Sequence, residues 1–206
     1  MLEILICTYG DGLSQAIKVP IGYHNNISYL ICHQAPQNYE LDTETVMYLK
    51  SREDIRYLQF NDSGLSRNRN HCIDNISSLS QYVYICDDDV TLSKDIYSIV
   101  EKAFSEFNYD ILTFKVSDLN GTPFKLYKAN PFHHNTMSAL SVSSIEVVVK
   151  ADKLKEYDLR FDNRFGIGAE FPTGEENIFL IDCINNGLEA FFINKVIVHH
   201  PLESSG

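Results

Sequence analysis

Residues 82–90 (Tyr82-Val83-Tyr84-Ile85-Cys86-Asp87-Asp88-Asp89-Val90) join an apolar run to three consecutive carboxylates. The first five residues are aromatic, β-branched or otherwise apolar and include no glycine or proline, which predicts a buried strand. In an extended backbone, Asp87 and Asp89 would point to one side and Asp88 to the other. Two acidic side chains at the carboxyl end of a strand are half of a site for a hard divalent cation, but a solvated acidic turn would have the same sequence.

Composition limits the classes of protein that fit. The chain has 206 residues, 44% hydrophobic and 22% charged, which suits one globular α/β domain with a sizeable core. The net charge of −11 argues against nucleic acid as a partner. The five cysteines form no C-x-x-C pair and are expected to be buried free thiols of a cytoplasmic protein. No signal peptide is visible and no apolar run approaches the ~20 residues that span a membrane, so only peripheral contact with the inner membrane face is left open.

The periodicity predicts strands alternating with helices in the first half, which favours a parallel sheet. Ligands of such sheets bind at the carboxyl ends of strands, where Asp87–Asp89 lie. A helix is expected from Ser93 to Phe107, and no helix is expected before a strand within 139–149. The other expected strands are 2–9, 28–34, 55–60, 110–116 and 190–198, and the other helices lie within 40–51, over 65–76 and from Gly174 to Asn186.

Three further groups of residues could take part in ligand binding or catalysis. Gly64 to Asn70 combines a helix start with Arg67 and Arg69, which suits phosphate or nucleotide binding or else a solvated basic face. Thr173-Gly174-Glu175-Glu176 fits a capping box, in which Thr173 would cap the helix, or a general base at a helix N-terminus. His199-His200 ends the last strand, so one imidazole could complete a metal site.

The order of these motifs resembles that of the family 2 glycosyltransferases of bacterial type. The resemblance starts at Thr8-Tyr9, includes all the groups above, and covers nearly the whole chain. It implies a GT-A fold, a Rossmann-like three-layer α/β sandwich with a mixed, mostly parallel central sheet. It also implies a single domain over 1–206, with a nucleotide-binding half at about 1–92 and an acceptor-binding half at about 93–206.

The implied activity is metal-dependent inverting transfer of a sugar from a nucleoside-diphosphate sugar, most simply a UDP-sugar, to an acceptor hydroxyl. The acceptor would be a glycan or a lipid-linked glycan, in the synthesis of surface polysaccharide or glycan. The resemblance assigns roles residue by residue: the base is Glu176, with Glu175 supporting the acceptor site. The nucleotide contacts are Thr8, Tyr9, Arg67, Arg69, Asp87 and Asp88, and the ligands of Mn²⁺ or Mg²⁺ are Asp87 and Asp89, with His199 or His200.

The sequence departs from the family pattern at three places. Cys32-His33-Gln34 stands where an acidic residue often holds the nucleoside, which leaves the base contacts open. The motif is Glu-Glu rather than Glu-Asp, which lengthens the base by one methylene. Relatives usually continue beyond the last strand, so a chain that ends at Gly206 is expected to be a truncated form or a minimal domain.

Other activities fit parts of the pattern. Asp87-Asp88-Asp89-Val90-Thr91 also matches the motif of haloacid-dehalogenase-like phosphohydrolases, in which Asp87 would be the nucleophile. That motif normally follows the first strand, whereas three strands are expected before it here. A sugar-phosphate nucleotidyltransferase would need a Gly-rich loop with Arg and Lys after the first strand, and this chain lacks one. A non-catalytic module that binds a nucleotide sugar is the remaining alternative.

Overall fold

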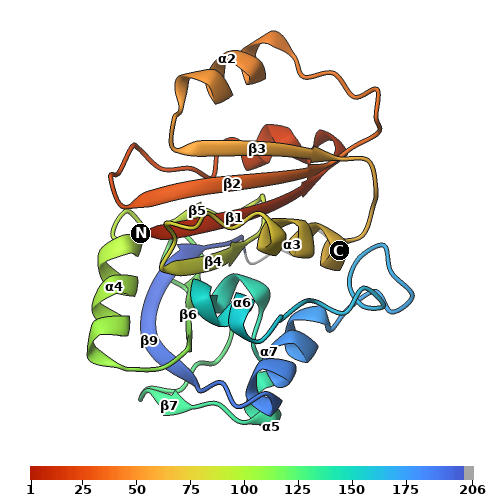
Figure 1. Ribbon diagram of the computed structural model, residues 1–206. Helices are drawn as coiled ribbons and strands as arrows, with labels where there is room; N and C mark the ends of the chain where they lie inside the picture. The colour runs from red at the N-terminus through yellow and green to blue at the C-terminus, as the bar shows by residue number, and fades with distance from the viewer. Residues whose placement is uncertain (202–206) are drawn as a thin grey trace.

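A mixed β-sheet runs through the part of the chain that the computed structural model describes, residues 1–201 (Figure 1). The residues after Pro201, to which the expectation of a truncated end applies, lie outside the described part. The strands are β1 (Leu2–Tyr9), β2 (Ile27–Gln34), β3 (Ile55–Phe60), β4 (Tyr82–Cys86), β5 (Thr91–Leu92), β6 (Ile111–Ser117), β7 (Phe132–His133), β8 (Val147–Lys150) and β9 (Ala190–His199). The α-helices are α1 (Leu13–Ala16), α2 (Thr43–Ser51), α3 (Leu65–Asp74), α4 (Ile96–Glu106), α5 (Thr136–Ala139), α6 (Ala151–Glu156) and α7 (Glu175–Asn185), and two 3₁₀ turns are η1 (Gly10–Gly12) and η2 (Ser144–Glu146).

The strand order creates a reversal point between β1 and β4. The order across the sheet is β3-β2-β1-β4-β8-β6-β9-β5, and β7 pairs with β9. The first four strands are parallel, whereas β8 runs antiparallel to both of its neighbours. The chain moves outward from β1 to β3 and then returns to the other side of β1 at β4. In open α/β sheets, ligand sites lie outside the carboxyl ends of the strands at such a point.

Helices cover both faces of the sheet, because alternate residues of the buried strands point to opposite sides. On one face, Ile4 and Ile6 share a core with side chains of α1 and α4. On the other face, Leu5 and Cys7 pack with side chains of α3, α6 and α7. The expected three-layer α/β arrangement with a mostly parallel sheet is therefore confirmed, as is the burial of the cysteines.

Two predictions about helices were wrong. Helix α4 begins at Ile96 with Asp95 as its N-cap residue, because the Ser93 amide donates to the Ile197 carbonyl and so belongs to the sheet edge. Helix α5 precedes β8, where no helix was expected. It has one turn, stabilised by a capping box between Asn135 and Ser138, and one turn is too short to produce an apolar periodicity.

Candidate active site

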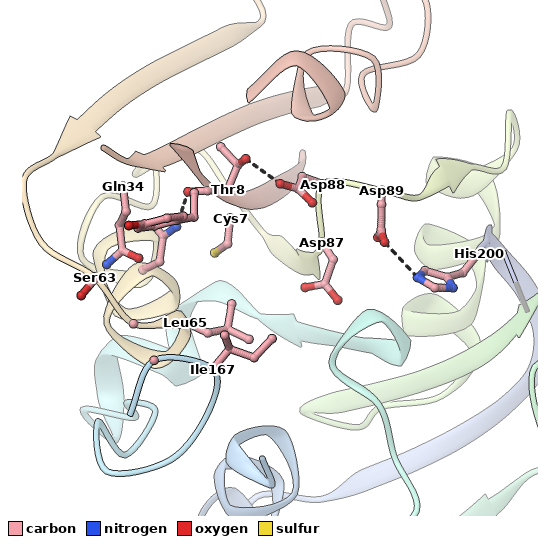
Figure 2. Close-up of a pocket in the computed structure, with 14 residues that line it drawn as sticks. Cys7, Thr8, Gln34, Ser63, Leu65, Asp87, Asp88, Asp89, Ile167 and His200 are labelled. Carbon is pink, nitrogen blue, oxygen red and sulfur yellow. Dashed lines mark hydrogen bonds and ion pairs between the residues drawn. The ribbon is translucent and has the colours of Figure 1, made fainter. Parts of the chain in front are cut away.

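A cavity of about 570 Å³ opens at the carboxyl ends of β1, β2 and β4, the reversal point of the sheet (Figure 2). Its walls come from six separate parts of the chain. They are Cys7, Thr8 and Tyr9 at the end of β1, Gln34 at the end of β2, Ser63, Gly64, Leu65 and Asn68 around the start of α3, Asp87, Asp88 and Asp89 after β4, Ile167 and Gly168 before α7, and His200 after β9.

The three carboxylates after β4 point in different directions (Figure 2). The strand ends at Cys86 and the chain then turns, so the strict alternation expected for an extended backbone does not apply. Asp87 Oδ1 accepts from Arg69 Nη2 at 3.1 Å, and Asp88 Oδ2 accepts from the Thr8 hydroxyl at 2.5 Å. Asp89 Oδ2 lies 3.3 Å from His200 Nε2. Each acid therefore has a different partner, and all three line the cavity.

The three carboxylates Asp87, Asp88 and Asp89 form an acidic rim of the cavity, and the chemistry of this rim suits a divalent cation. Burial raises the pKa of Asp88, as do the negative charges of Asp89 and Asp87, so the rim carries a repulsion that a cation would relieve. Asp89 and His200 offer oxygen and nitrogen to the same space, a donor set that suits Mn²⁺. His199 instead bonds through Nδ1 to Ser117 Oγ and lies outside the cavity lining. Within residues 1–201, no group of three or more His, Cys, Asp or Glu side chains is arranged around a single metal position.

At the end of β2, the cavity-lining side chain of Gln34 is held by a carboxylate that the sequence did not reveal. Gln34 Nε2 donates to Asp62 Oδ1 at 2.8 Å, so a carboxylate that follows β3 reaches the end of β2. The neighbouring His33 turns away and bonds to the Gly10 carbonyl and the Tyr57 hydroxyl. The Tyr9 side chain is 64% exposed at the rim. Gln34 thus supplies the polar group at the end of β2, where an acid is missing, and Asp62 fixes its amide.

The two arginines of α3 have different surroundings. Arg67 is exposed and lines a smaller hollow beside Arg164 and Glu170, outside the main cavity. Arg69 is only 2% exposed and pairs with both Asp87 and Glu175. The apolar periodicity of 65–76 identified the helix but gave no indication that an arginine would be buried in it.

Helix α7 places two glutamates beside this arginine. The predicted capping box is absent: the N-cap residue is Gly174, in a left-handed conformation with φ of 91°, and no side chain caps the helix. With Thr173 as the N-cap residue the helix would begin at Gly174, but it begins at Glu175, and Thr173 is exposed. Burial raises the pKa of Glu176, as does the Glu175 carboxylate, while Arg69 acts in the opposite direction. A carboxylate with a raised pKa at a helix start suits a general base.

The Gly-rich segment before α7, residues 164–172, packs against the start of α3. The Leu65 amide donates to the Ile167 carbonyl at 2.9 Å, and Ser66 Oγ donates to the Phe165 carbonyl at 2.7 Å. The backbones of Gly64 and Gly168 approach so closely that a Cβ on Gly168 would lie 3.2 Å from Gly64 Cα. Ile167 and Gly168 thereby form one wall of the cavity.

Solved structures of S. aureus TarS share this architecture. TarS superposes with a TM-score of 0.73 at 12% identity, covering 97% of this chain and 36% of that one. TarS 1–349 in complex with UDP-GlcNAc gives 0.73 at 14% identity, covering 100% of this chain and 59% of that one, and its complex with UDP gives 0.71. The fold is that of a GT-A glycosyltransferase.

The GT-A likeness rests on structure alone. No family model matches the chain, and no curated protein matches it. The chain spans 36% to 60% of the length of the TarS chains that it matches. Within residues 1–201, no helix has both the length and the apolar character needed to cross a membrane.

Proposed function

We propose that this GT-A domain is a metal-dependent inverting glycosyltransferase that moves a sugar from a UDP-sugar to an acceptor hydroxyl of a glycan or lipid-linked glycan. The observation that carries the proposal is the convergence of Asp87–Asp89 and the start of α3 at one cavity, with Arg69 joining Asp87 to Glu175 at the start of α7. The TarS 1–349 complexes with UDP and UDP-GlcNAc support a uridine nucleotide as the donor group. Synthesis of a surface polysaccharide or other glycan is the expected setting.

Glu176 is the proposed general base. The acceptor hydroxyl loses its proton to this carboxylate as its oxygen attacks C1 of the donor sugar, while the bond from C1 to the diphosphate breaks on the opposite face. The raised pKa of Glu176 brings the base closer to neutral pH, where proton transfer is most effective. One such base contributes roughly 10²–10⁴-fold to the rate.

Asp89 and His200 are the proposed holders of Mn²⁺ or Mg²⁺, with Asp87 turned towards Arg69 and Asp88 towards Thr8. A cation bound there would neutralise the negative charge of the diphosphate leaving group. Thr8 and Asp88 line the wall of the cavity next to Tyr9 and Gln34, where the nucleoside is expected to bind.

Calorimetry with UDP tests the proposal directly. UDP is expected to bind more tightly with Mn²⁺ than without it, and Asp89→Asn should remove that difference, whereas Asp152→Asn on the exposed face of α6 should not. At 100 times its dissociation constant, UDP should stabilise the protein by about 2.7 kcal/mol. Release of UDP from UDP-GlcNAc, with water as the acceptor, then separates an enzyme from a binding module. Absence of UDP binding would reject the proposal.

The phosphohydrolase alternative loses its support from the fold. The acidic triplet follows β4 of a GT-A sheet, and Asp87 Oδ1 is held by the buried guanidinium of Arg69. A phosphohydrolase would release phosphate from p-nitrophenyl phosphate, and Asp87→Asn would abolish that release. The glycosyltransferase proposal expects no such release.

A further inference from the structure

Arg69 is a buried cation between two acidic groups that lie far apart in the sequence. Its Nη2 lies 3.1 Å from Asp87 Oδ1 and its Nη1 lies 2.8 Å from Glu175 Oε1. Asp87 belongs to the acidic rim after β4, and Glu175 is the first residue of α7. One guanidinium therefore joins the donor side of the cavity to the helix that carries the proposed base.

The position of the guanidinium is fixed on its other sides. Arg69 Cζ lies 5.3 Å from the centre of the Phe161 ring, a cation–π contact. Asn70 holds the Phe161 backbone through two hydrogen bonds, to its carbonyl at 2.9 Å and from its amide at 2.8 Å. Arg69 Nε is buried and has no hydrogen-bond partner within residues 1–201. The polar contacts of the guanidinium are therefore the two ion pairs made by Nη1 and Nη2.

Glu175 is closed off from the cavity by the same arrangement. Its residue is 6% exposed, and it is absent from the cavity lining. A Cβ placed on Gly166 would lie 3.2 Å from Glu175 Cδ, so the Gly-rich segment packs directly against this carboxylate. Glu175 is thus placed to anchor the first turn of α7, whereas the resemblance implied a supporting role at the acceptor site.

We infer that Arg69 is a positioning residue: through Glu175 it sets the place of Glu176 relative to the acidic rim. This inference rests on the proposed function. Removal of one partner of a buried ion pair leaves an uncompensated charge, so α7 would lose its anchor when Arg69 is replaced. A displacement of a catalytic group by about 1 Å costs roughly 10²-fold in rate.

Arg69→Met tests the inference, with Arg160→Met as the matched control. Arg160 also lies between two carboxylates, Asp74 and Asp158, but at the surface. Arg69→Met should lower the rate of UDP release from UDP-GlcNAc by roughly 10²-fold. UDP affinity should change only a few-fold, because Arg69 does not line the cavity. Arg69→Lys keeps the charge but loses the two-pronged contact, so it should recover part of the rate.

The pH profile supplies a readout that a purely structural role would not move. The groups that act on Glu176 are Glu175 and Arg69, and loss of the Arg69 cation raises the pKa of Glu176. The acid limb of the rate of UDP release should therefore move to higher pH in Arg69→Met and return in Arg69→Lys. An unmoved limb, or an equal loss of UDP affinity and rate, would overturn the inference.

The two ion pairs of Arg69, with Asp87 and with Glu175, form a bridge that thermal unfolding can test even if the proposed function fails. A wild-type protein that neither binds UDP nor releases it would reject the function and leave the bridge to be judged by unfolding alone. Arg69→Met should lower the unfolding midpoint more than Arg69→Met combined with Glu175→Gln, because the double variant no longer buries the Glu175 charge. Equal losses in the two variants would overturn the bridge.

Discussion

Replacement of Glu176 should lower the rate of the reaction without weakening the binding of UDP. Glu176→Gln removes the proposed proton acceptor and keeps the size of the side chain, so we expect UDP release from UDP-GlcNAc to fall roughly 10²–10⁴-fold. UDP binding should stay nearly intact, because Glu176 is absent from the cavity lining. Turnover assays and calorimetry on the same preparation make the comparison.

Glu106→Gln is a suitable control, since Glu106 is an exposed carboxylate at the end of α4. It should retain the wild-type rate. Full activity of Glu176→Gln would rule out Glu176 as the base.

Residue type and order were enough to locate much of the candidate site. Thr8, Tyr9, Asp87–Asp89 and His200 were proposed from the sequence, and all of them line the cavity. Side-chain directions could not be foreseen, because they depend on partners distant in the sequence. Arg69, for example, lies 106 positions from Glu175 along the chain. The contact between Gln34 and Asp62 was missed for the same reason.

At the scale of elements, Gly168 controls the contact between the Gly-rich segment and α3. Gly168→Ala introduces a side chain at a φ of +82° and places its Cβ 3.2 Å from Gly64 Cα. We expect a loss of stability of about 1–3 kcal/mol from the backbone strain. We also expect weaker UDP binding, because this contact forms a wall of the cavity.

Gly121→Ala is the matched control for Gly168. Gly121 has a similar φ of +86°, but nothing lies within 4 Å of a Cβ placed there. Gly121→Ala should therefore lose comparable stability in thermal unfolding and leave UDP affinity unchanged. An equal effect of both variants on UDP affinity would contradict the proposed wall.

His134 connects β6 to α5 and should make stability depend on pH. Its Nε2 lies 2.8 Å from Thr113 Oγ1 and its Nδ1 lies 3.1 Å from Ser138 Oγ. Burial lowers the pKa of His134 from 6.5 to about 4. Between these values the unfolded state binds more protons than the folded one, so stability from this group is present above pH 6.5 and is lost as the pH falls towards 4.

His134→Gln should remove this part of the pH dependence, measured as the change in unfolding midpoint between pH 7 and pH 4. His24→Gln, at an exposed position, should retain it. Identical pH profiles for wild type and His134→Gln would contradict the assignment.

The sequence identified elements with strong periodicity and missed short ones. Strands β1 to β4 and helices α3 and α7 agree with the predicted ranges, because each has a run of apolar or β-branched residues or a clear stop signal. Helix α2 lies within the predicted range 40–51, although the periodicity there is weak. Strands β5 and β7 have two residues each, and they exist only because β9 offers backbone partners. Such elements are set by tertiary contacts, which a local pattern does not contain.

At the scale of the whole molecule, the sheet and both cores cross the boundary between the predicted halves at about residue 92. Strand β4, in the first half, pairs with β1 on one side and with β8, from the second half, on the other. The core that contains Leu5 also contains Val149 and Phe179. A nucleotide-binding half without its partner would expose the edge of β4 and part of both cores to water.

We therefore predict that the chain unfolds as one unit and that the fragment 1–92 does not fold alone. The complete chain should give a single thermal transition, with the same midpoint by circular dichroism and tyrosine fluorescence. The fragments 1–92 and 93–206 should each lack a cooperative transition, because each loses apolar contacts on both faces of the sheet. A cooperative transition of 1–92 close to the midpoint of the complete chain would show that the nucleotide-binding half is an independent domain.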